Sequence, residues 1–290
     1  MTETREHATH EWNIGRRSLT YGARTLVMGV LNVTPDSFSD GGQFFSVDHA
    51  LEHARQMIDE GADIIDIGGE STRPGSEFVS AAEELDRVMP VIESLVKRTS
   101  TPISIDTTKV EVARAALKAG AEIVNDISAL RFEPAIADEV SRTKAGLVLM
   151  HSRGTPKTMQ KLPPVTDIVT EVIVDLRHSV AKAEEHGIAH ENIAIDPGIG
   201  FGKTVNQNLE LIAKLAQLAR AFPNYPLMIG TSRKYFIGKL LGGVPANERL
   251  HGTLASVVAS VLNGAHIVRV HDVKAIVEAV RLADAIAARS

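Results

Sequence analysis

Polar side chains close several short apolar runs of this chain, and one group of them offers mainly hydrogen-bond acceptors. Asp106, Asn125 and Asp196 each end such a run. Carboxylates accept only, whereas the Asn amide both accepts and donates, so the three together suit a flat heterocycle with N–H donors and a carbonyl. They predict one half of a binding site for a donor-rich ring.

A second group of run-ending residues is cationic or carries N–H donors, which suit a phosphate or a carboxylate. It consists of Arg73, Lys234, Arg269 and His271. Arg269 and His271 lie within the apolar run HIVRVHD (266–272), which argues against a solvated ion cluster on the surface. A ligand with a donor-rich ring at one end and an anion at the other would contact both groups.

Eight apolar runs must position these residues, and each is followed by a stretch of helical periodicity. They cover 25–33, 62–69, 102–108, 122–127, 146–151, 193–198, 226–232 and 266–272. Strands this apolar are buried on both faces, and strands that alternate with helices pair in parallel. The pattern predicts an α/β fold, a single-domain (β/α)8 TIM barrel, whose strand ends converge on one mouth. An open doubly wound sheet is the alternative.

The composition limits the possible partners and the compartment. The chain has 31 Lys and Arg against 36 Asp and Glu, a net charge of −5, which argues against nucleic-acid and membrane partners. Cys is absent, which excludes disulfide scaffolds and thiol chemistry. The first ten residues contain no apolar signal core, so we expect a cytoplasmic protein. We expect residues 1–11 to form a flexible tail and residues 12–290 to form the barrel.

The histidines give no sign of a metal site in the sequence alone. Most of the 11 are isolated, and no pair has the spacing of metal ligands.

Motifs along the chain, taken together, resemble those of the dihydropteroate synthase family. They span roughly residues 12 to 288 in the family's order, one at nearly every strand end. The segments are MGVLNVTPDSFSDGG (28–42), IDIGGESTRPGS (65–76), SIDTTK (104–109), IVNDI (123–127), LMHSRGTPKTMQ (149–160), DPGIGFGK (196–203), GTSRK (230–234) and RVHDV (269–273).

The resemblance implies a transferase of folate biosynthesis that joins a dihydropterin pyrophosphate to p-aminobenzoate, releasing pyrophosphate and 7,8-dihydropteroate. It also implies Mg²⁺ as cofactor and a homodimer. In the implied mechanism, Mg²⁺ and Arg269 neutralise the departing pyrophosphate, and Asp106 and Asp196 stabilise the pterin cation that is left. The free arylamine then attacks that cation, while the first two loops exclude water.

Motif by motif, the resemblance assigns the site residues to three ligand parts. The pterin would be held by Asp106, Asn125, Asp196 and Lys234, with Met150, Phe201 and Gly230 at its site and Arg269 over the ring. The pyrophosphate would be held by Asn32, Arg269 and His271, with Mg²⁺ reached through Asn32. The p-aminobenzoate would be held by Phe38, Asp40, Thr72, Arg73, Pro74 and Lys234. The catalytic residues among them would be Lys234, Arg269, Asp106, Asp196 and Asp40.

The p-aminobenzoate site carries one departure from the family pattern. Tyr235 follows Lys234, where some members have a Ser that assists the carboxylate, so backbone N–H groups at that helix start would have to bind it instead. The loop STRPGS has no extra residue between Pro74 and Gly75, which predicts ordinary sulfonamide sensitivity.

Two other functions are compatible with part of the pattern. A methyltetrahydrofolate:corrinoid methyltransferase would share the ring recognition but has no use for pyrophosphate ligands. Lys234, the segment 269–271 and the loop 32–42 therefore favour the synthase. A non-catalytic pterin-binding barrel would be expected to lose loop residues such as Asp40 and Arg73, and both are present.

Overall fold

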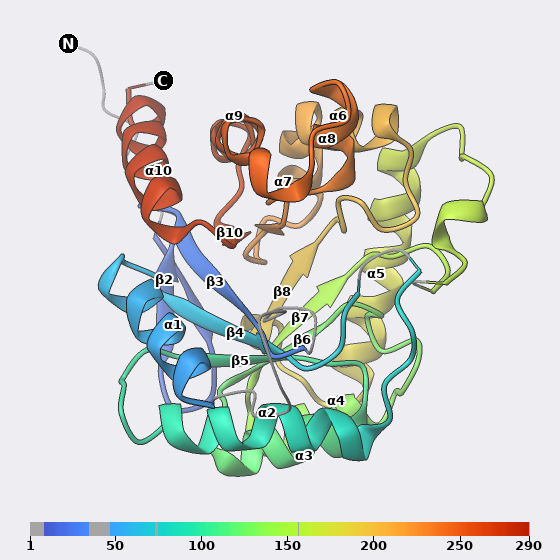
Figure 1. Cartoon of the computed structure of the whole chain (residues 1–290). Coiled ribbons are helices and arrows are strands. Elements are labelled where there is room, and N and C mark those ends of the chain that lie inside the picture. The colour runs from blue at the N-terminus through green and yellow to red at the C-terminus, as the bar shows by residue number, and fades with distance from the viewer. Residues whose placement is uncertain (1–8, 35–46, 73–74, 156, 290) are drawn as a thin grey trace.

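The computed structural model describes residues 9–34, 47–72, 75–155 and 157–289, and these residues form a barrel (Figure 1). Its sheet has eight strands in the order β8-β7-β6-β5-β4-β3-β10-β9, with neighbouring strands parallel. A bridge between Ile195 and Leu227 joins the two end strands, β8 and β9. The sheet therefore closes on itself, which confirms the TIM barrel and excludes the open doubly wound sheet.

Each predicted apolar run contains one barrel strand. Most of these strands are buried along their whole length, because helices cover the outer face and the packed interior covers the inner one. The strands are β3 (Leu26–Asn32), β4 (Ile64–Gly68), β5 (Ile103–Asp106), β6 (Ile123–Asp126), β7 (Gly146–Met150), β8 (Ile193–Asp196), β9 (Met228–Ile229) and β10 (Ile267–Val270).

Helices of the described chain surround the sheet. They are α1 (Val47–Asp59), α2 (Ala81–Leu95), α3 (Val110–Ala119), α4 (Ile136–Thr143), α5 (Ile168–Glu185), α6 (Val205–Ala213), α7 (Leu215–Ala221), α8 (Tyr235–Leu240), α9 (Leu250–Leu262) and α10 (Val273–Ala287). Short 3-10 turns lie at Met159–Lys161, His190–Asn192 and Ala246–Glu248. Among the helices that the structure describes, none combines the length and the apolar character needed to cross a lipid bilayer.

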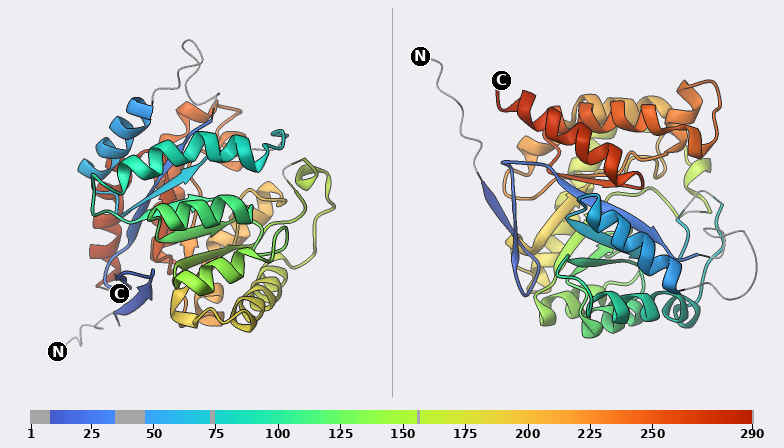
Figure 2. Two further views of the ribbon diagram at one scale, coloured as in Figure 1. Left: turned by 90° about the horizontal axis from the view of Figure 1, so that it is seen from below. Right: turned by 60° about the vertical axis from the view of Figure 1, so that its left-hand side comes forward.

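A hairpin that the sequence did not predict closes the N-terminal end of the barrel. It consists of β1 (His10–Asn13) and β2 (Ser18–Tyr21), and Figure 2 shows it at one end of the molecule. Trp12, Ile14 and Tyr21 pack there against inward-facing strand residues such as Met28 and Val148. Strand β1 begins at His10, two residues before the expected start of the barrel at residue 12.

Candidate active site

A cavity lies at the C-terminal ends of the strands, where the sequence predicted the site. It brings together nine of the predicted residues: Thr72, Asp106, Asn125, Met150, Asp196, Phe201, Gly230, Lys234 and Arg269. Two further lining residues, Ile127 and Ile199, were not predicted. Both are apolar and buried, so they offer contact surface for a flat ring.

Asn32 and His271 do not line this cavity but lie at the ends of neighbouring strands. Asn32 ends β3, which pairs with β10, and His271 directly follows β10. The His271 Nδ1 atom lies 3.0 Å from Ser232 Oγ. Burial, together with the charge of Arg269, lowers the pKa of His271 to about 3, so its ring is neutral at pH 7.

Four predicted residues cannot be placed. Phe38, Asp40, Arg73 and Pro74 lie outside the described residues.

Arg269 connects the acidic side chains of the site. Its Nε donates to Asp66 Oδ2 at 2.6 Å, and its Nη2 donates to Asp106 Oδ2 at 2.6 Å. Asn125 Nδ2 donates to the same Asp66 oxygen at 3.1 Å. Asp66 was not among the predicted residues, because it lies in the middle of β4 rather than at a strand end. A carboxylate inside a strand buried on both faces was the signal that could have found it.

Burial shifts the pKa values of the titratable groups that line the cavity. It raises the pKa of Asp106 to about 7, against the opposing charge of Arg269, and it raises that of Asp196. It lowers the pKa of Lys234 to about 8, and Arg269 acts in the same direction. Burial would lower the pKa of Arg269 too, but Asp66 and Asp106 raise it above its ordinary value. The guanidinium is therefore a permanent cation, whereas Lys234 can lose its proton just above neutral pH.

The loop after β8 is held in place by a buried lysine. Lys203 Nζ donates to the carbonyl oxygens of Gly198 at 2.8 Å, Phe201 at 3.2 Å and His151 at 3.3 Å. Gly198 has φ +67°, and a Cβ there would lie 1.8 Å from the His151 oxygen, so only glycine fits. Its N–H donates to Asp196 Oδ1 at 2.6 Å. These contacts fix Asp196 and the Phe201 backbone relative to the loop after β7.

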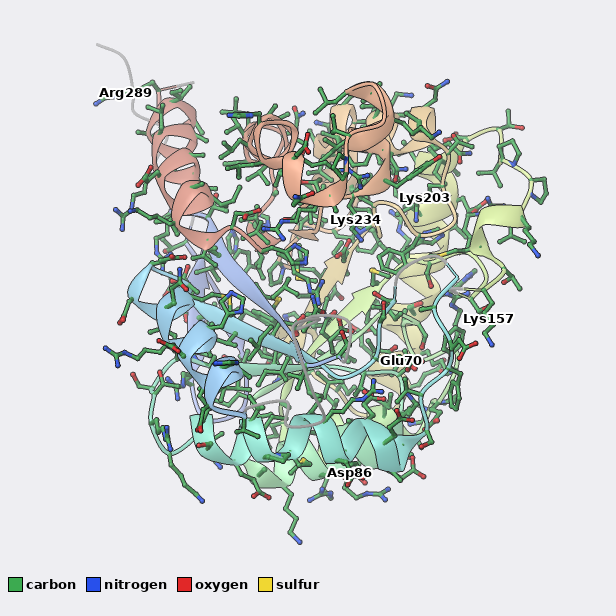
Figure 3. All side chains as sticks on the ribbon, in the orientation of Figure 1. Glu70, Asp86, Lys157, Lys203, Lys234 and Arg289 are labelled. Carbon is green, nitrogen blue, oxygen red and sulfur yellow. The ribbon has the colours of Figure 1, made fainter. Side chains whose placement is uncertain are left out.

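Lys234 belongs to the same side of the site. Its Nζ lies 4.1 Å from the centre of the Phe201 ring, a cation–π contact. Figure 3 shows Lys203 and Lys234 in the upper part of the molecule, with Glu70 and Lys157 below them.

A buried ion cluster anchors the chain on both sides of residues 73–74. Lys109 Nζ lies 2.5 Å from Glu70 Oε2 and 2.5 Å from Glu84 Oε2. Glu70 Oε1 accepts from the N–H of Val79 at 3.2 Å. A groove lined by Glu70, Glu84 and Lys109 shares Thr72, Asp106 and Ile127 with the cavity. The groove therefore leads from the surface to the ring site.

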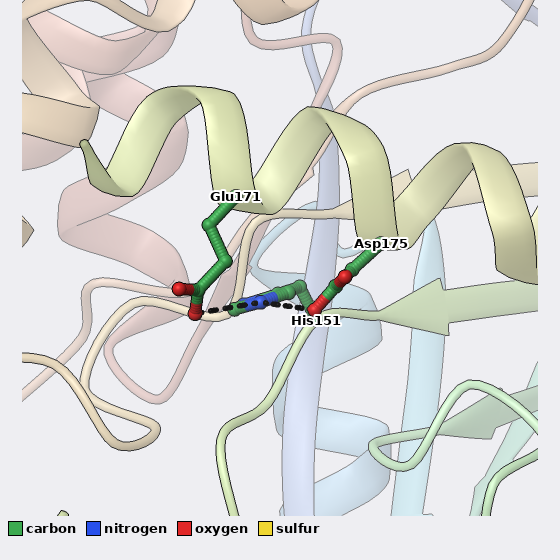
Figure 4. Close-up of side chains that lie close together, drawn as sticks. All are labelled: His151, Glu171 and Asp175. Atoms are coloured by element: carbon green, nitrogen blue, oxygen red, sulfur yellow. Dashed lines mark ion pairs between the residues drawn. The ribbon is translucent and has the colours of Figure 1, made fainter. Parts of the chain in front are cut away.

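His151, Glu171 and Asp175 form a cluster that sequence spacing did not show (Figure 4). His151 Nε2 lies 3.3 Å from Asp175 Oδ2 and 3.9 Å from Glu171 Oε1. Arg153 Nε already lies 2.8 Å from that Glu171 oxygen. Burial and the charge of Lys203 lower the pKa of His151 to about 4. Arg153 already pairs with Glu171, and none of the three residues of the cluster lines the cavity. The cluster therefore joins helix α5 to the loop after β7 and has a structural role.

Comparison with known proteins extends the similarity over nearly the whole chain. The family model of the pterin binding enzymes matches residues 28–271. The dihydropteroate synthase of Synechocystis sp. is 49% identical over 273 residues, which is 94% of each chain.

Solved structures agree with this result. The Xanthomonas albilineans dihydropteroate synthase with 4-aminobenzoic acid has a TM-score of 0.89 at 43% identity, covering 96% of this chain and 98% of that one. The Burkholderia cenocepacia dihydropteroate synthase complexed with 7,8-dihydropteroate has a TM-score of 0.86 at 43% identity, covering 97% of both chains.

Proposed function

The chain belongs to the dihydropteroate synthase family of pterin-binding enzymes, and we propose which of its residues bind the substrates and promote the reaction. The reaction is a transfer in folate biosynthesis that joins a dihydropterin pyrophosphate to p-aminobenzoate and forms 7,8-dihydropteroate. The chain is 49% identical to the Synechocystis synthase over 94% of its length, which favours the synthase over the methyltransferase and the non-catalytic barrel. The observation that carries our residue assignment is the one cavity that contains nine predicted residues.

The pterin ring occupies this cavity in our proposal. Asp196 accepts from ring N–H groups through the carboxylate oxygen that Gly198 does not use. Asn125 offers a second acceptor, and Lys234 donates to the ring carbonyl. Met150 and Phe201 supply apolar surface, since both side chains are almost fully buried at the cavity wall.

The pyrophosphate lies at the ends of β3 and β10 in our proposal. Arg269 provides a permanent positive charge, and neutral His271 provides an N–H group. Asn32 offers an amide oxygen for Mg²⁺, which commonly takes one or two protein oxygens and fills its other positions with water and substrate phosphate. Asn32 supplies one such oxygen here, and bound Mg²⁺ would supply charge neutralisation for the leaving group.

The chemical step needs little from the protein besides electrostatics. The bond between the pterin methylene carbon and the pyrophosphate oxygen breaks, and its electron pair leaves with the pyrophosphate. Asp106 and Asp196 stabilise the resulting pterin cation, the arylamine nitrogen forms the new C–N bond, and that nitrogen then releases a proton. Because an aromatic amine is already neutral at pH 7, no general base is required.

p-Aminobenzoate reaches the ring through the groove that meets the cavity at Thr72, and Lys234 lines the cavity beyond it. Phe38, Asp40, Arg73 and Pro74 stay predictions for this subsite, because they lie outside the described residues. Helix α8 begins at Tyr235 and has six residues, so its dipole adds little to carboxylate binding. We propose that backbone N–H groups at this helix start bind the carboxylate together with Arg73, which stays a prediction. We expect ordinary sulfonamide inhibition, which a parallel assay with a sensitive synthase would check.

We propose that the enzyme is a homodimer that works in the cytoplasm. Exposed apolar side chains on the two C-terminal helices support association, because such residues mark interfaces when they gather. They are Leu262 on α9 and Leu282 and Ile286 on α10. Light scattering would give the oligomer. A pyrophosphate-bearing substrate does not cross a bilayer unaided, which supports a cytoplasmic reaction.

The test of the function is a reconstituted assay. The protein is incubated with the dihydropterin pyrophosphate, p-aminobenzoate and Mg²⁺, and pyrophosphate release is followed while each component is omitted in turn. We expect release only in the complete mixture. Release without p-aminobenzoate would indicate a hydrolase instead.

A further inference from the structure

We propose that Asp66 is a positioning residue that makes the cavity selective for rings with N–H donors, such as the 2-amino group of a pterin. It does so by fixing the orientation of the Asn125 amide, and it also holds Arg269. This inference rests on the proposed function, because it concerns the same ring site.

Asp66 is buried and acts through other residues. Its side chain is 0% exposed, and it is absent from the cavity lining. Its Oδ2 accepts from Asn125 Nδ2 at 3.1 Å and from Arg269 Nε at 2.6 Å. Both donors belong to residues that line the cavity. A single carboxylate in the barrel interior thus holds two ring-site residues from strands β6 and β10.

The carboxylate decides which way the Asn125 amide points. An ionised carboxylate accepts hydrogen bonds and cannot donate, so the NH₂ group of Asn125 must face Asp66. The amide oxygen then faces away from Asp66. Asn125 Oδ1 is buried and has no hydrogen-bond partner among the described residues. A buried acceptor without a partner is costly, and a ring N–H would satisfy it.

The fixed orientation of the Asn125 amide favours a pterin over a lumazine. A pterin carries an amino group at ring position 2, whereas a lumazine carries an oxygen there. A donor at this edge pairs with a fixed acceptor, but an oxygen leaves two acceptors facing each other in a buried site. With Asn in place of Asp66, the new amide can donate as well as accept. The Asn125 amide is then free to turn its NH₂ group toward the ligand.

The test compares two ring probes on the whole chain. Dissociation constants are measured by calorimetry for 6-hydroxymethylpterin and 6-hydroxymethyllumazine, with the native protein and Asp66→Asn. We expect the native protein to prefer the pterin and Asp66→Asn to lose roughly tenfold of that preference, the effect of one misoriented buried hydrogen bond. An unchanged ratio in Asp66→Asn would overturn the inference alone. A native protein that binds neither ring would overturn the proposed function as well.

Asp126→Asn is the matched control. Asp126 is also fully buried, but its oxygens accept from the N–H groups of Ser128 and Leu130 instead of from ring-site side chains. The preference of the Asp126→Asn variant for pterin over lumazine should equal that of the native protein. An equal loss of this preference in Asp126→Asn and Asp66→Asn would contradict a specific role for Asp66.

Asp66→Asn leaves the Arg269 charge less compensated, which can impair folding. A double variant therefore tests the inference without that unpaired charge. Asp66→Asn/Arg269→Gln removes both charges of the pair and is compared with Arg269→Gln. Loss of the pterin preference in the double variant, with retention in Arg269→Gln, supports action through Asn125. Equal ratios in these two variants would overturn it.

Discussion

The two ends of the barrel are built from opposite kinds of residue. At the N-terminal end, the hairpin places Trp12, Ile14 and Tyr21 over an apolar interior. The polar atom of Trp12 is satisfied there, because its indole N–H donates to the Asn192 carbonyl at 2.9 Å. At the C-terminal end, Asp66 and Arg269 form an ion pair in the interior, and the buried atoms Asp66 Oδ1 and Asn125 Oδ1 lack partners in the described chain.

This difference in residue type indicates that the N-terminal end stabilises the fold and that the C-terminal end binds the ligand. Burying apolar groups stabilises a protein, whereas burying charges costs free energy unless they are well paired. The mouth therefore holds a buried acceptor, Asn125 Oδ1, that a bound ring would satisfy, and the apolar packing at the closed end offsets the cost of the buried charges. Substitutions at the two ends should have separate effects, on stability at one end and on activity at the other.

The largest effect on stability is expected at the closed end. Trp12→Ala removes a fully buried indole and should lower the free energy of unfolding by about 3–5 kcal/mol. The folded fraction should keep its kcat and KM, because the site lies at the opposite end of the strands. Denaturant unfolding and steady-state kinetics on one preparation would check this. Altered kcat or KM in the fully folded variant would show that the closed end also affects activity.

The largest effect on activity is expected from Lys234→Ala. Loss of one preorganised electrostatic contact should lower kcat by at least about 10²-fold. Stability should stay equal or rise, because the variant no longer buries an ammonium group. Lys214→Ala is a suitable control, since Lys214 lies on the surface between α6 and α7. A near-normal rate for Lys234→Ala would mean that the catalytic centre lies elsewhere.

A smaller effect, on binding alone, is expected from Asp196→Asn. Replacing a charge-assisted hydrogen bond should weaken pterin binding by about 1.5–3 kcal/mol. Calorimetry with 6-hydroxymethylpterin measures this directly, and Asp138→Asn, on the exposed side of α4, serves as control. Unchanged affinity would remove Asp196 from the ring site.

The last comparison is a pH dependence that gives stability and activity opposite signs. The pKa of Lys234 is about 8 in the folded protein and near 10.5 when unfolded. Between these values the unfolded chain binds more protons, so this group makes stability rise with pH. Native protein should therefore be less stable than Lys234→Met at pH 7, and the gap should narrow from pH 8 to 10.5.

Activity should change in the other direction. If charged Lys234 holds the pterin carbonyl, kcat/KM falls as the pH rises through about 8. Urea unfolding of both proteins and kinetics of the native enzyme, at pH 7, 8, 9 and 10, would measure both trends. A stability gap that stays constant over this range would show that Lys234 is not desolvated.

Strands and strand ends were predictable, whereas the hairpin and the supporting residues were not. The barrel strands lie in long apolar runs, but half of the residues in β1 and β2 are exposed, and each of these strands buries one apolar side chain. Lys203 is an ordinary lysine in the sequence, and only the folded loop brings three carbonyls to its ammonium. Asp66 was overlooked because its importance depends on partners from other strands.

The sequence alone determined which side chains stand at the barrel mouth. A strand buried on both faces must be apolar along its length, and right-handed crossovers bring all the strand ends to one side. Only the tertiary structure decided which of these side chains touch. Arg269 and Asp66 are 203 positions apart, and no local pattern relates them. Their contact depends on strand register and barrel closure, which the packing of the whole core sets.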